Sequence, residues 1–504
     1  MVFGNTQRIK EQEGFMAGDK PNIVYILADD MGYGDVSYLN SESKIRTEHL
    51  DRLGHSGMVF TDAHASSAVC TPSRYSILTG RYNWRSTLKQ GVTFGYSRPV
   101  IEDGRLTVAS LLKSQGYATA CVGKWHLGMD WPANGDDEAD VDFSRPIQNG
   151  PVTRGFDYFY GISASLDMPP YVYIENDRAT AVPDRETEDR GMAFWRKGPT
   201  APDFRHEEAL PKLTEKAISF IRQNRDNPFF LYFPLPAPHT PILPLPEFKG
   251  KSKTNDYGDF CLQVDWTVGQ IMEALRACGI EENTLFIFAA DNGCSPRADF
   301  THLAALGHHP SYHFRGHKAD IYEGGHRIPL LVRWPARIVP ESTCDQVVCL
   351  CDLMATCAHI LGVELPDNTT EDSVSNLPVW LGESVPSPLR EATVHHSIDG
   401  SFSIRKGHWK LELCPGSGGW SYPKVGEEPD GTPPIQLYDL NADISERANV
   451  QDQHPEIVSE LRDLLTAYVK NGRSTPGAPQ PNTGPLHWPQ LNWLVEREGG
   501  LVQK

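Results

Sequence analysis

Residues 21–30 read PNIVYILADD, an apolar run of strand length that ends on two aspartates. Residues 284–292 repeat this pattern as TLFIFAADN, so that a second run leads into Asp291 and Asn292. Continuous apolar runs of this length are typical of strands buried on both faces of a mostly parallel sheet. Ligands of such sheets bind beyond the carboxyl ends of the strands, so the residues after each run are the first candidates for a functional site.

Further apolar runs alternate with segments of helical periodicity. Expected strands cover 118–122, 229–233 and 329–332, and expected helices cover 106–115, 213–223 and 260–277. This alternation predicts an α/β fold with a large, mostly parallel or mixed sheet flanked by helices.

A break rich in Pro, Asp and Ser at residues 364–390 precedes a change of pattern. Short alternating runs after it predict a small antiparallel sheet, and residues 454–469 read as an amphipathic helix. The expected organisation is an N-terminal extension (1–20), a main domain (21–384), a smaller C-terminal α+β domain (385–475) and an irregular tail (476–504).

Composition and charge exclude several classes of protein. The chain has 504 residues and a formal net charge of −18, which argues against sequence-independent binding of nucleic acid by Lys and Arg. No apolar run approaches the roughly 18 residues that a membrane span needs. No secretory signal is visible in the polar first 20 residues, so the compartment stays open between the cytoplasm and a chain that lacks its signal. The ten cysteines contain no CxxC pair, and we expect mostly free, buried thiols.

The residues at the two strand ends are all oxygen donors. Asp29, Asp30, Asp291 and Asn292 offer three carboxylates and one amide, which would form a site for a hard cation if the two strands are neighbours. Ca²⁺ or Mg²⁺ fits this set better than Zn²⁺, which usually recruits His or Cys. The alternative is turn and helix-cap chemistry, for which these residue types are also typical.

Residues 70–81 read CTPSRYSILTGR and resemble the sulfatase signature C-x-P-S-R-x(3)-L-T-G-R. Three more segments resemble motifs of that family: GKWHLG at 123–128, PAPHTP at 236–241 and GHKADIYEGG at 316–325. The chain is similar to the type I, formylglycine-dependent sulfatases of the arylsulfatase A-like branch over about residues 21–449. This resemblance implies an alkaline-phosphatase-like core.

The resemblance also implies an unusual nucleophile. In that family the signature cysteine, here Cys70, is oxidised to Cα-formylglycine by a formylglycine-generating enzyme or an anaerobic maturase. One hydroxyl of the hydrated aldehyde attacks sulfur. The other then loses its proton so that the C=O reforms as sulfate leaves, which avoids a stable sulfated enzyme. A cation bound to the same hydroxyl lowers its pKa.

Carried over by motif, the resemblance gives roles to the remaining residues. Cys70 in its modified form joins the strand-end residues named above as a ligand of Ca²⁺, with Mg²⁺ as the alternative. Arg74 pairs with a metal-side carboxylate, and Lys124 and Lys318 hold sulfate oxygens. His126 is the base that releases sulfate, and His239 is the acid that protonates the leaving alcohol.

The sequence is less informative about the sulfate ester. Residues 307–316, GHHPSYHFRG, resemble a segment of bacterial N-acetylgalactosamine-sulfate and galactose-sulfate sulfatases and could contact a sugar. The alternative for this segment is an exposed polar loop with incidental histidines. The candidate substrate-binding residues are His313, Arg315 and Ser165, with weaker candidates Asp167, Tyr171, Tyr173, His395, His396 and Arg405.

We therefore expect an exo-acting carbohydrate sulfatase that acts on sulfated Gal or GalNAc units of glycosaminoglycans or mucin-type glycans. Alternatives within enzymes are an arylsulfatase of broad specificity and a phosphonate or phosphate monoester hydrolase of the same superfamily. Outside enzymes they are an unmodified carbohydrate-binding relative and a zinc protein that uses the histidines of residues 302–317. The expected partners are a sulfated carbohydrate or aryl sulfate substrate and the activating enzyme of Cys70.

Overall fold

The computed structural model of the chain describes residues 20–133, 140–385, 388–424, 426–485 and 487–497. The predicted N-terminal extension lies, except for its last residue, outside this part. No helix in the described part is long and apolar enough to cross a bilayer. All ten cysteines are free, and all but the half-buried Cys278 are buried, as expected.

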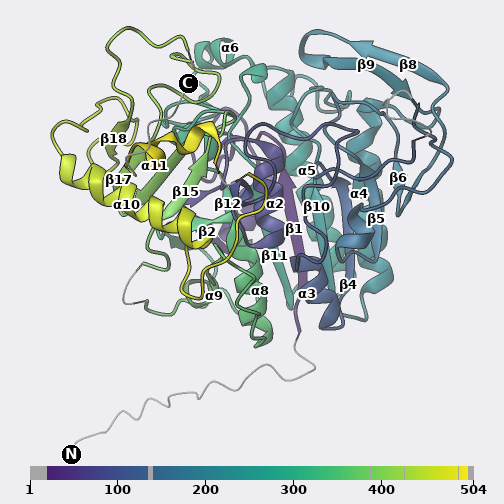
Figure 1. Cartoon of the computed structure of the whole chain (residues 1–504). Helices are drawn as coiled ribbons and strands as arrows, with labels where there is room; N and C mark the ends of the chain where they lie inside the picture. Colours follow the sequence, from purple (N-terminus) through teal and green to yellow (C-terminus); the bar gives the residue numbers. More distant parts are fainter. Residues whose placement is uncertain (1–19, 134–139, 386–387, 425, 486, 498–504) are drawn as a thin grey trace, which may run out of the picture.

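A mixed sheet of ten strands forms the centre of the molecule (Figure 1). The order across the sheet is β13 (Ser342–Cys344), β2 (Met58–Phe60), β12 (Leu330–Arg333), β11 (Thr284–Ala290), β1 (Asn22–Ala28), β10 (Phe229–Pro234), β4 (Ala118–Lys124), β5 (Tyr158–Ile162), β6 (Ile174–Glu175) and β7 (Arg178–Ala179). The five strands from β11 to β5 are parallel to their neighbours, and β12 and β6 run antiparallel beside them. The predicted α/β sheet is therefore confirmed.

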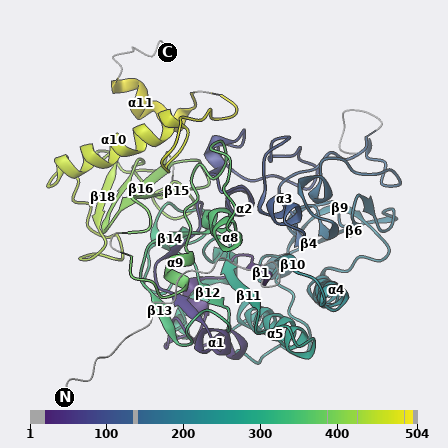
Figure 2. The same cartoon turned by 90° about the horizontal axis from the view of Figure 1, so that it is seen from below.

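Helices cover both faces of this sheet, as Figure 2 shows. One layer holds α1 (Glu48–His55), α4 (Ala209–Asn224) and α5 (Asp256–Ala277), and the other holds α2 (Cys70–Thr79), α3 (Val108–Ser114) and α8 (Leu353–Leu361). Every residue of β1 and β11 is buried, which explains why these strands read as unbroken apolar runs. Shorter helices are α6 (Phe300–Ala305), α7 (Glu323–His326) and α9 (Leu377–Trp380).

A separate antiparallel sheet follows near the C-terminus. Its order is β15 (Thr393–His396), β16 (Phe402–Lys406), β17 (Trp409–Glu412) and β18 (Gln436–Asp439), with α10 (Pro455–Asn471) packed on β16 and β17. This small sheet was expected, whereas the domain boundary at residue 385 stays a prediction. The tail is not wholly irregular, because α11 (Asn492–Arg497) forms where Leu491 and Leu494 become buried.

Some elements carry no sequence signal of the kind used above. The hairpin of β8 (Arg185–Asp189) and β9 (Trp195–Thr200) stands at one edge of the molecule (Figure 1) and is mostly exposed, so no apolar alternation marks it. The short pair β3 (Ala63–His64) and β14 (Val348–Cys349) lies beside the main sheet. Two-residue strands of this kind are below the length at which periodicity can be read.

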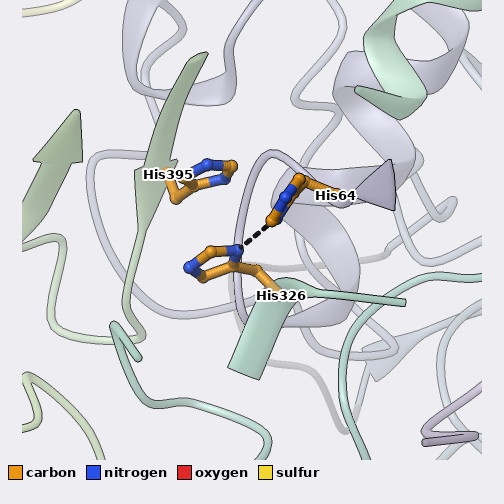
Figure 3. Close-up of side chains that lie close together, drawn as sticks. All are labelled: His64, His326 and His395. Carbon is orange, nitrogen blue, oxygen red and sulfur yellow. Dashed lines mark hydrogen bonds between the residues drawn. The ribbon is translucent and has the colours of Figure 1, made fainter. Parts of the chain in front are cut away.

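Three fully buried histidines, His64, His326 and His395, join the main domain to the small sheet (Figure 3). Lys410 Nζ lies 3.2 Å from His326 Nε2, the two Nδ1 atoms of His326 and His64 are 3.0 Å apart, and His64 Nε2 lies 2.7 Å from Asp62. Each of these three contacts has one donor if both rings are neutral. Lys410 then donates to His326 Nε2, His326 Nδ1–H donates to His64 Nδ1, and His64 Nε2–H donates to Asp62. The rings of His326 and His395 are stacked at 3.8 Å and 8°. Because a ring nitrogen binds a metal in the plane of its ring, these two stacked rings cannot both point at one ion. The arrangement therefore indicates a hydrogen-bonded interface and not a metal centre.

These histidines make stability depend on pH. Burial lowers the pKa of all three, so they stay neutral in the fold below pH ~6.5, where histidines of the unfolded chain become charged. The unfolded chain then binds more protons, and the free energy of unfolding falls as pH falls, by up to about 1.4 kcal/mol per pH unit for each histidine.

His395→Gln removes one of these groups and should reduce the slope of unfolding free energy between pH 6.5 and 5 by about one proton. Urea unfolding at several pH values measures this slope. His302→Gln is the matched control, because His302 is exposed on α6. A slope that is the same in the parent and in His395→Gln would contradict the assignment.

Candidate active site

The two aspartate-bearing strand ends lie side by side. Ala28 of β1 is paired with Ala290 of β11, so Asp29 and Asp30 meet Asp291 and Asn292 at one edge of the sheet. The backbone N–H of Asp30 donates to Asp291 Oδ1 at 3.3 Å. All four residues are at most 1% exposed. The two strands are therefore neighbours, which is the condition that the sequence analysis set for a cation site.

Three buried cations compensate the three carboxylates. Lys124, at the end of β4, donates to Asp29 Oδ2 at 2.6 Å. Lys318 lies 2.7 Å from Asp30 Oδ1, and Arg74 donates to Asp291 Oδ2 through Nε at 3.0 Å and Nη2 at 2.7 Å. Burial alone would raise the pKa of Asp29, but Lys124, His239 and Arg74 outweigh it and hold this pKa well below its usual range. Asp29 is thus ionised and paired. Burial and the neighbouring charge of Asp29 raise the pKa of Asp291, although Arg74 and Lys124 oppose this shift.

Cys70 begins α2, with its Sγ 3.6 Å from Asp29 Oδ1. Arg74 lies one turn further along the same helix and therefore on the same face. Gly80 ends α2 with φ of +65°, a left-handed conformation that suits glycine. Burial raises the pKa of the Cys70 thiol to about 12, so the unmodified side chain is protonated at neutral pH and is a poor nucleophile.

His126 has one ring nitrogen available. Its Nε2–H donates to the carbonyl of Thr93 at 2.7 Å, and its buried Nδ1 has no hydrogen-bond partner among the described residues. Burial, Lys124 and Arg74 hold the pKa of His126 well below its usual range. The ring is therefore neutral, with a free lone pair that can accept a proton. The φ angle of His126 is +55°, a strained value that the surrounding structure must enforce.

His239 is arranged as a proton donor. Its Nδ1–H donates to the carbonyl of Thr240 at 2.6 Å, and its Nε2 lies 3.6 Å from Asp30 Oδ2. The side chain is nearly buried but borders a cavity. A proton on Nε2 would therefore point away from the backbone and towards the carboxylates and a bound substrate.

The residues at the strand ends fit a divalent cation. Ligand atoms of Asp29, Asp30, Cys70 and His239 lie within 4.8 Å of one another. The amide of Asn292 donates to Asp30 Oδ1 at 2.7 Å, while its buried Oδ1 has no hydrogen-bond partner in the described part of the chain. An unpaired buried amide oxygen beside carboxylates is a donor set for Ca²⁺ or Mg²⁺.

A cavity of about 320 Å³, here called the active-site cavity, opens at this edge of the sheet. His239 and Lys318 form its inner part, because they are only 8% and 5% exposed. Other residues that line it are Asp167, Phe194, Arg196, Arg297 and Trp420. Four of these, all but Asp167, were missed by sequence reasoning. They belong to the β8–β9 hairpin and to loops, and no motif marks them.

The structure places the predicted substrate-binding residues in different locations. His313 and Arg315 line a second cavity, with Ser445 and Arg447, and not the active-site cavity. Arg315 donates to the carbonyl of Glu446 at 2.7 Å, so it fastens a C-terminal loop. Ser165 is buried, and its Oγ has no hydrogen-bond partner among the described residues.

Of the weaker candidates, only Asp167 lines the active-site cavity. Tyr171 and Tyr173 are buried in the main core. Arg405 pairs with Asp62 at 2.6 Å in the interface that also contains His395. His396 is buried against Phe402 in the core of the small sheet.

Comparisons with known proteins identify the family. Residues 21–363 match the Sulfatase family. The chain is 36% identical to an N-acetylgalactosamine-6-O-sulfatase of Bacteroides thetaiotaomicron, over 92% of this chain and 96% of that protein. It is 32% identical to human arylsulfatase A, over 90% of this chain and 88% of that protein.

Solved structures lead to the same family. One from Bacteroides thetaiotaomicron, described in connection with the metabolism of multiple glycosaminoglycans, superposes with a TM-score of 0.78 at 35% identity, covering 89% of this chain and 99% of that one. A phosphonate monoester hydrolase of Agrobacterium radiobacter shares the fold, with a TM-score of 0.57 at 18% identity over 88% and 95% of the two chains. The chain belongs to the sulfatase family and is a sulfuric ester hydrolase.

Proposed function

We propose that this sulfatase removes a 6-sulfate from a terminal GalNAc or Gal unit of a glycosaminoglycan or mucin-type glycan, with a formylglycine made from Cys70 as nucleophile. The observation that carries this proposal is the convergence of Cys70 with the carboxylate cluster, two lysines and two histidines at one edge of the sheet. The 6-sulfated GalNAc unit is taken from the name of the 36% identical relative.

Asp29, Asp30, Asp291 and Asn292 Oδ1 would hold Ca²⁺ or Mg²⁺, which when bound lowers the pKa of the attacking hydroxyl and offsets charge on the sulfate oxygens. The carboxylates then no longer need the two lysines as partners. The ammonium groups of Lys124 and Lys318 become available for sulfate oxygens, which they bind as compact charges. Arg74 keeps its two hydrogen bonds to Asp291 Oδ2 and holds α2 against the strand ends.

The two histidines divide the proton transfers. His239 Nε2 donates a proton to the ester oxygen, because its Nδ1–H is held by Thr240. His126 Nδ1 has the free lone pair that accepts the proton of the second hydroxyl at position 70. The hydrated aldehyde of formylglycine would supply this second hydroxyl, and oxidation of Cys70 by an activating enzyme would form the aldehyde.

Asp167 supports a sugar substrate. Its Oδ2 accepts from Arg196 at 2.5 Å, while its buried Oδ1 has no hydrogen-bond partner in the described part. A sugar hydroxyl would satisfy this oxygen, because a buried acceptor without a partner is costly. The cavity volume of about 320 Å³ is at the lower end of the ~300–1,000 Å³ range of small-ligand pockets. This size supports binding of one terminal sugar and therefore exo action.

Production with a formylglycine-generating enzyme should convert Cys70, which exchanges sulfur for oxygen and removes two hydrogens in the mass of its peptide. Cys70→Ala should lower the rate of sulfate ester hydrolysis by ~10³-fold or more, because the nucleophile is absent. Cys278→Ala, at the end of α5, is the matched control and should keep the parent rate. A Cys70→Ala variant as active as the parent would exclude this nucleophile.

Removal of divalent cations by a chelator should abolish activity, and added Ca²⁺ or Mg²⁺ should restore it. Asn292→Ala removes one neutral oxygen ligand, so it should raise the cation concentration needed for half-maximal activity. Titration of cation against activity measures this shift. Full activity of the chelated protein would contradict the assigned ligand set.

Asp167→Ala should lower the ratio of kcat/KM on 6-sulfated GalNAc to kcat/KM on a small aryl sulfate by about 10- to 100-fold, which is the loss of one charged hydrogen bond. Arg315→Gln is the comparison, because Arg315 lines the second cavity. A ratio that falls in Arg315→Gln and not in Asp167→Ala would instead support the sugar site expected from residues 307–316. Equal ratios in all three proteins would favour an arylsulfatase of broad specificity.

A further inference from the structure

Arg297 lines the active-site cavity but has no role in sulfate ester hydrolysis as derived above. It is exposed, and it lies in a short 3-10 turn, Pro296–Ala298, a few residues after the strand end that carries Asp291 and Asn292. Among the described residues, no carboxylate lies within ion-pair distance of its guanidinium. Arg297 therefore presents an uncompensated positive charge at the active-site cavity.

The ring of Phe194 lies near two guanidinium groups. The Cζ of Arg297 lies 5.4 Å from the centre of the Phe194 ring, and that of Arg196 lies 5.6 Å from it. Arg196 is neutralised by its ion pair with Asp167, whereas Arg297 keeps its full charge. The aromatic ring favours both cations through cation–π attraction but does not neutralise them. An anion at this rim would pair with Arg297.

Trp420 stands at the same cavity as an exposed aromatic ring. It is 41% exposed, although most large apolar side chains of this protein are buried. Its backbone N–H donates to Asp320 Oδ1 at 2.8 Å, and the N–H of Ser421 donates to the same oxygen at 3.0 Å. Asp320 is two residues from Lys318, so the loop of Trp420 is fastened to the loop that holds the catalytic lysine. A rigid, exposed indole at a polar cavity is suited to the apolar face of a sugar ring.

The positions of these residues separate an inner from an outer part of the cavity. Lys318 and His239 are nearly buried and serve the sulfate ester, while Arg297 and Trp420 are exposed at the opening. A cavity of about 320 Å³ holds one sugar, so the rest of a glycan chain must leave past the exposed residues. The second sugar of such a chain would therefore meet Arg297 and Trp420.

We propose that Arg297, Phe194 and Trp420 form an outer subsite that binds a carboxylate or sulfate group on the sugar next to the one that loses its sulfate. This inference rests on the proposed function, because it requires a glycan substrate. The outer subsite selects oligosaccharides with two or more anionic groups over neutral chains. Arg297 supplies the charge, since a guanidinium binds carboxylate and sulfate oxygens through paired N–H donors, and Trp420 supplies a charge-independent contact.

The test uses the activated, metal-loaded enzyme and four substrates that all carry a terminal 6-sulfated GalNAc. They are the monosaccharide, a disaccharide with a neutral second sugar, one with a uronic acid in that place and one with a sulfated second sugar. The parent should show a lower KM for both anionic disaccharides than for the neutral one. The uronic acid and the sulfated sugar distinguish the two sources of the second anion.

Arg297→Gln should reduce the preference for anionic over neutral disaccharides, expressed as a ratio of kcat/KM, by about five- to ten-fold. This reduction should appear in KM. Increasing salt should reduce the parent's preference in the same direction, because the contact is exposed. Arg225→Gln, on the far end of α4, makes the same change of charge away from the cavity and should leave the ratio at the parent value. Trp420→Ala should raise KM for neutral and anionic disaccharides alike.

Two results would overturn the outer subsite. One is a parent that does not distinguish anionic from neutral disaccharides. The other is an Arg297→Gln variant that weakens all four substrates by the same factor. Failure of the proposed function is a different outcome, in which the parent does not release sulfate from the 6-sulfated GalNAc monosaccharide but does hydrolyse another sulfate ester.

Discussion

The site depends on one electrostatic constraint, the burial of three carboxylates at the ends of two hydrogen-bonded parallel strands. Asp29, Asp30 and Asp291 are almost inaccessible to water, so each negative charge must have a partner. Two lysines and Arg74 provide one cation for each carboxylate. With all three carboxylates ionised, the three cations would balance the charge of the cluster. A divalent cation bound as proposed would add positive charge and attract a sulfate ester.

The same constraint explains where the catalytic groups lie in the fold. β1, β11 and β4 are neighbours or near neighbours in the sheet, and each ends on a residue of the cluster or just before one. α2 begins at Cys70 and reaches the cluster through Arg74, so the proposed nucleophile and its supporting arginine are carried by one helix. Strands and helices hold the chemical groups, while loops and a hairpin form the outer part of the active-site cavity.

The small C-terminal sheet contributes to the site and to its support. Trp420 comes from the loop after β17 and is held by Asp320, next to the loop of Lys318. Arg315 donates to the carbonyl of Glu446. The buried histidines His64 and His326 form a separate hydrogen bond at the same interface. The shape of the active-site cavity therefore depends on packing between two sheets. Most strands of the main sheet are more than a hundred residues away in the sequence from the strands of the small sheet.

The sequence by itself determined the buried strands, the oxygen-donor residues at their ends and the motif residues from Cys70 to Lys318. These are local features, because a strand buried on both faces must be apolar throughout and a chemical motif needs fixed residue types at fixed spacing. Only the tertiary structure decided which residues line the active-site cavity. Arg315, a sequence candidate, donates to the carbonyl of Glu446 and lines the second cavity, whereas Arg297 and Trp420, which line the active-site cavity, carry no sequence signal of their own. Access to a cavity is set by the packing of segments distant in sequence, so no local pattern records it.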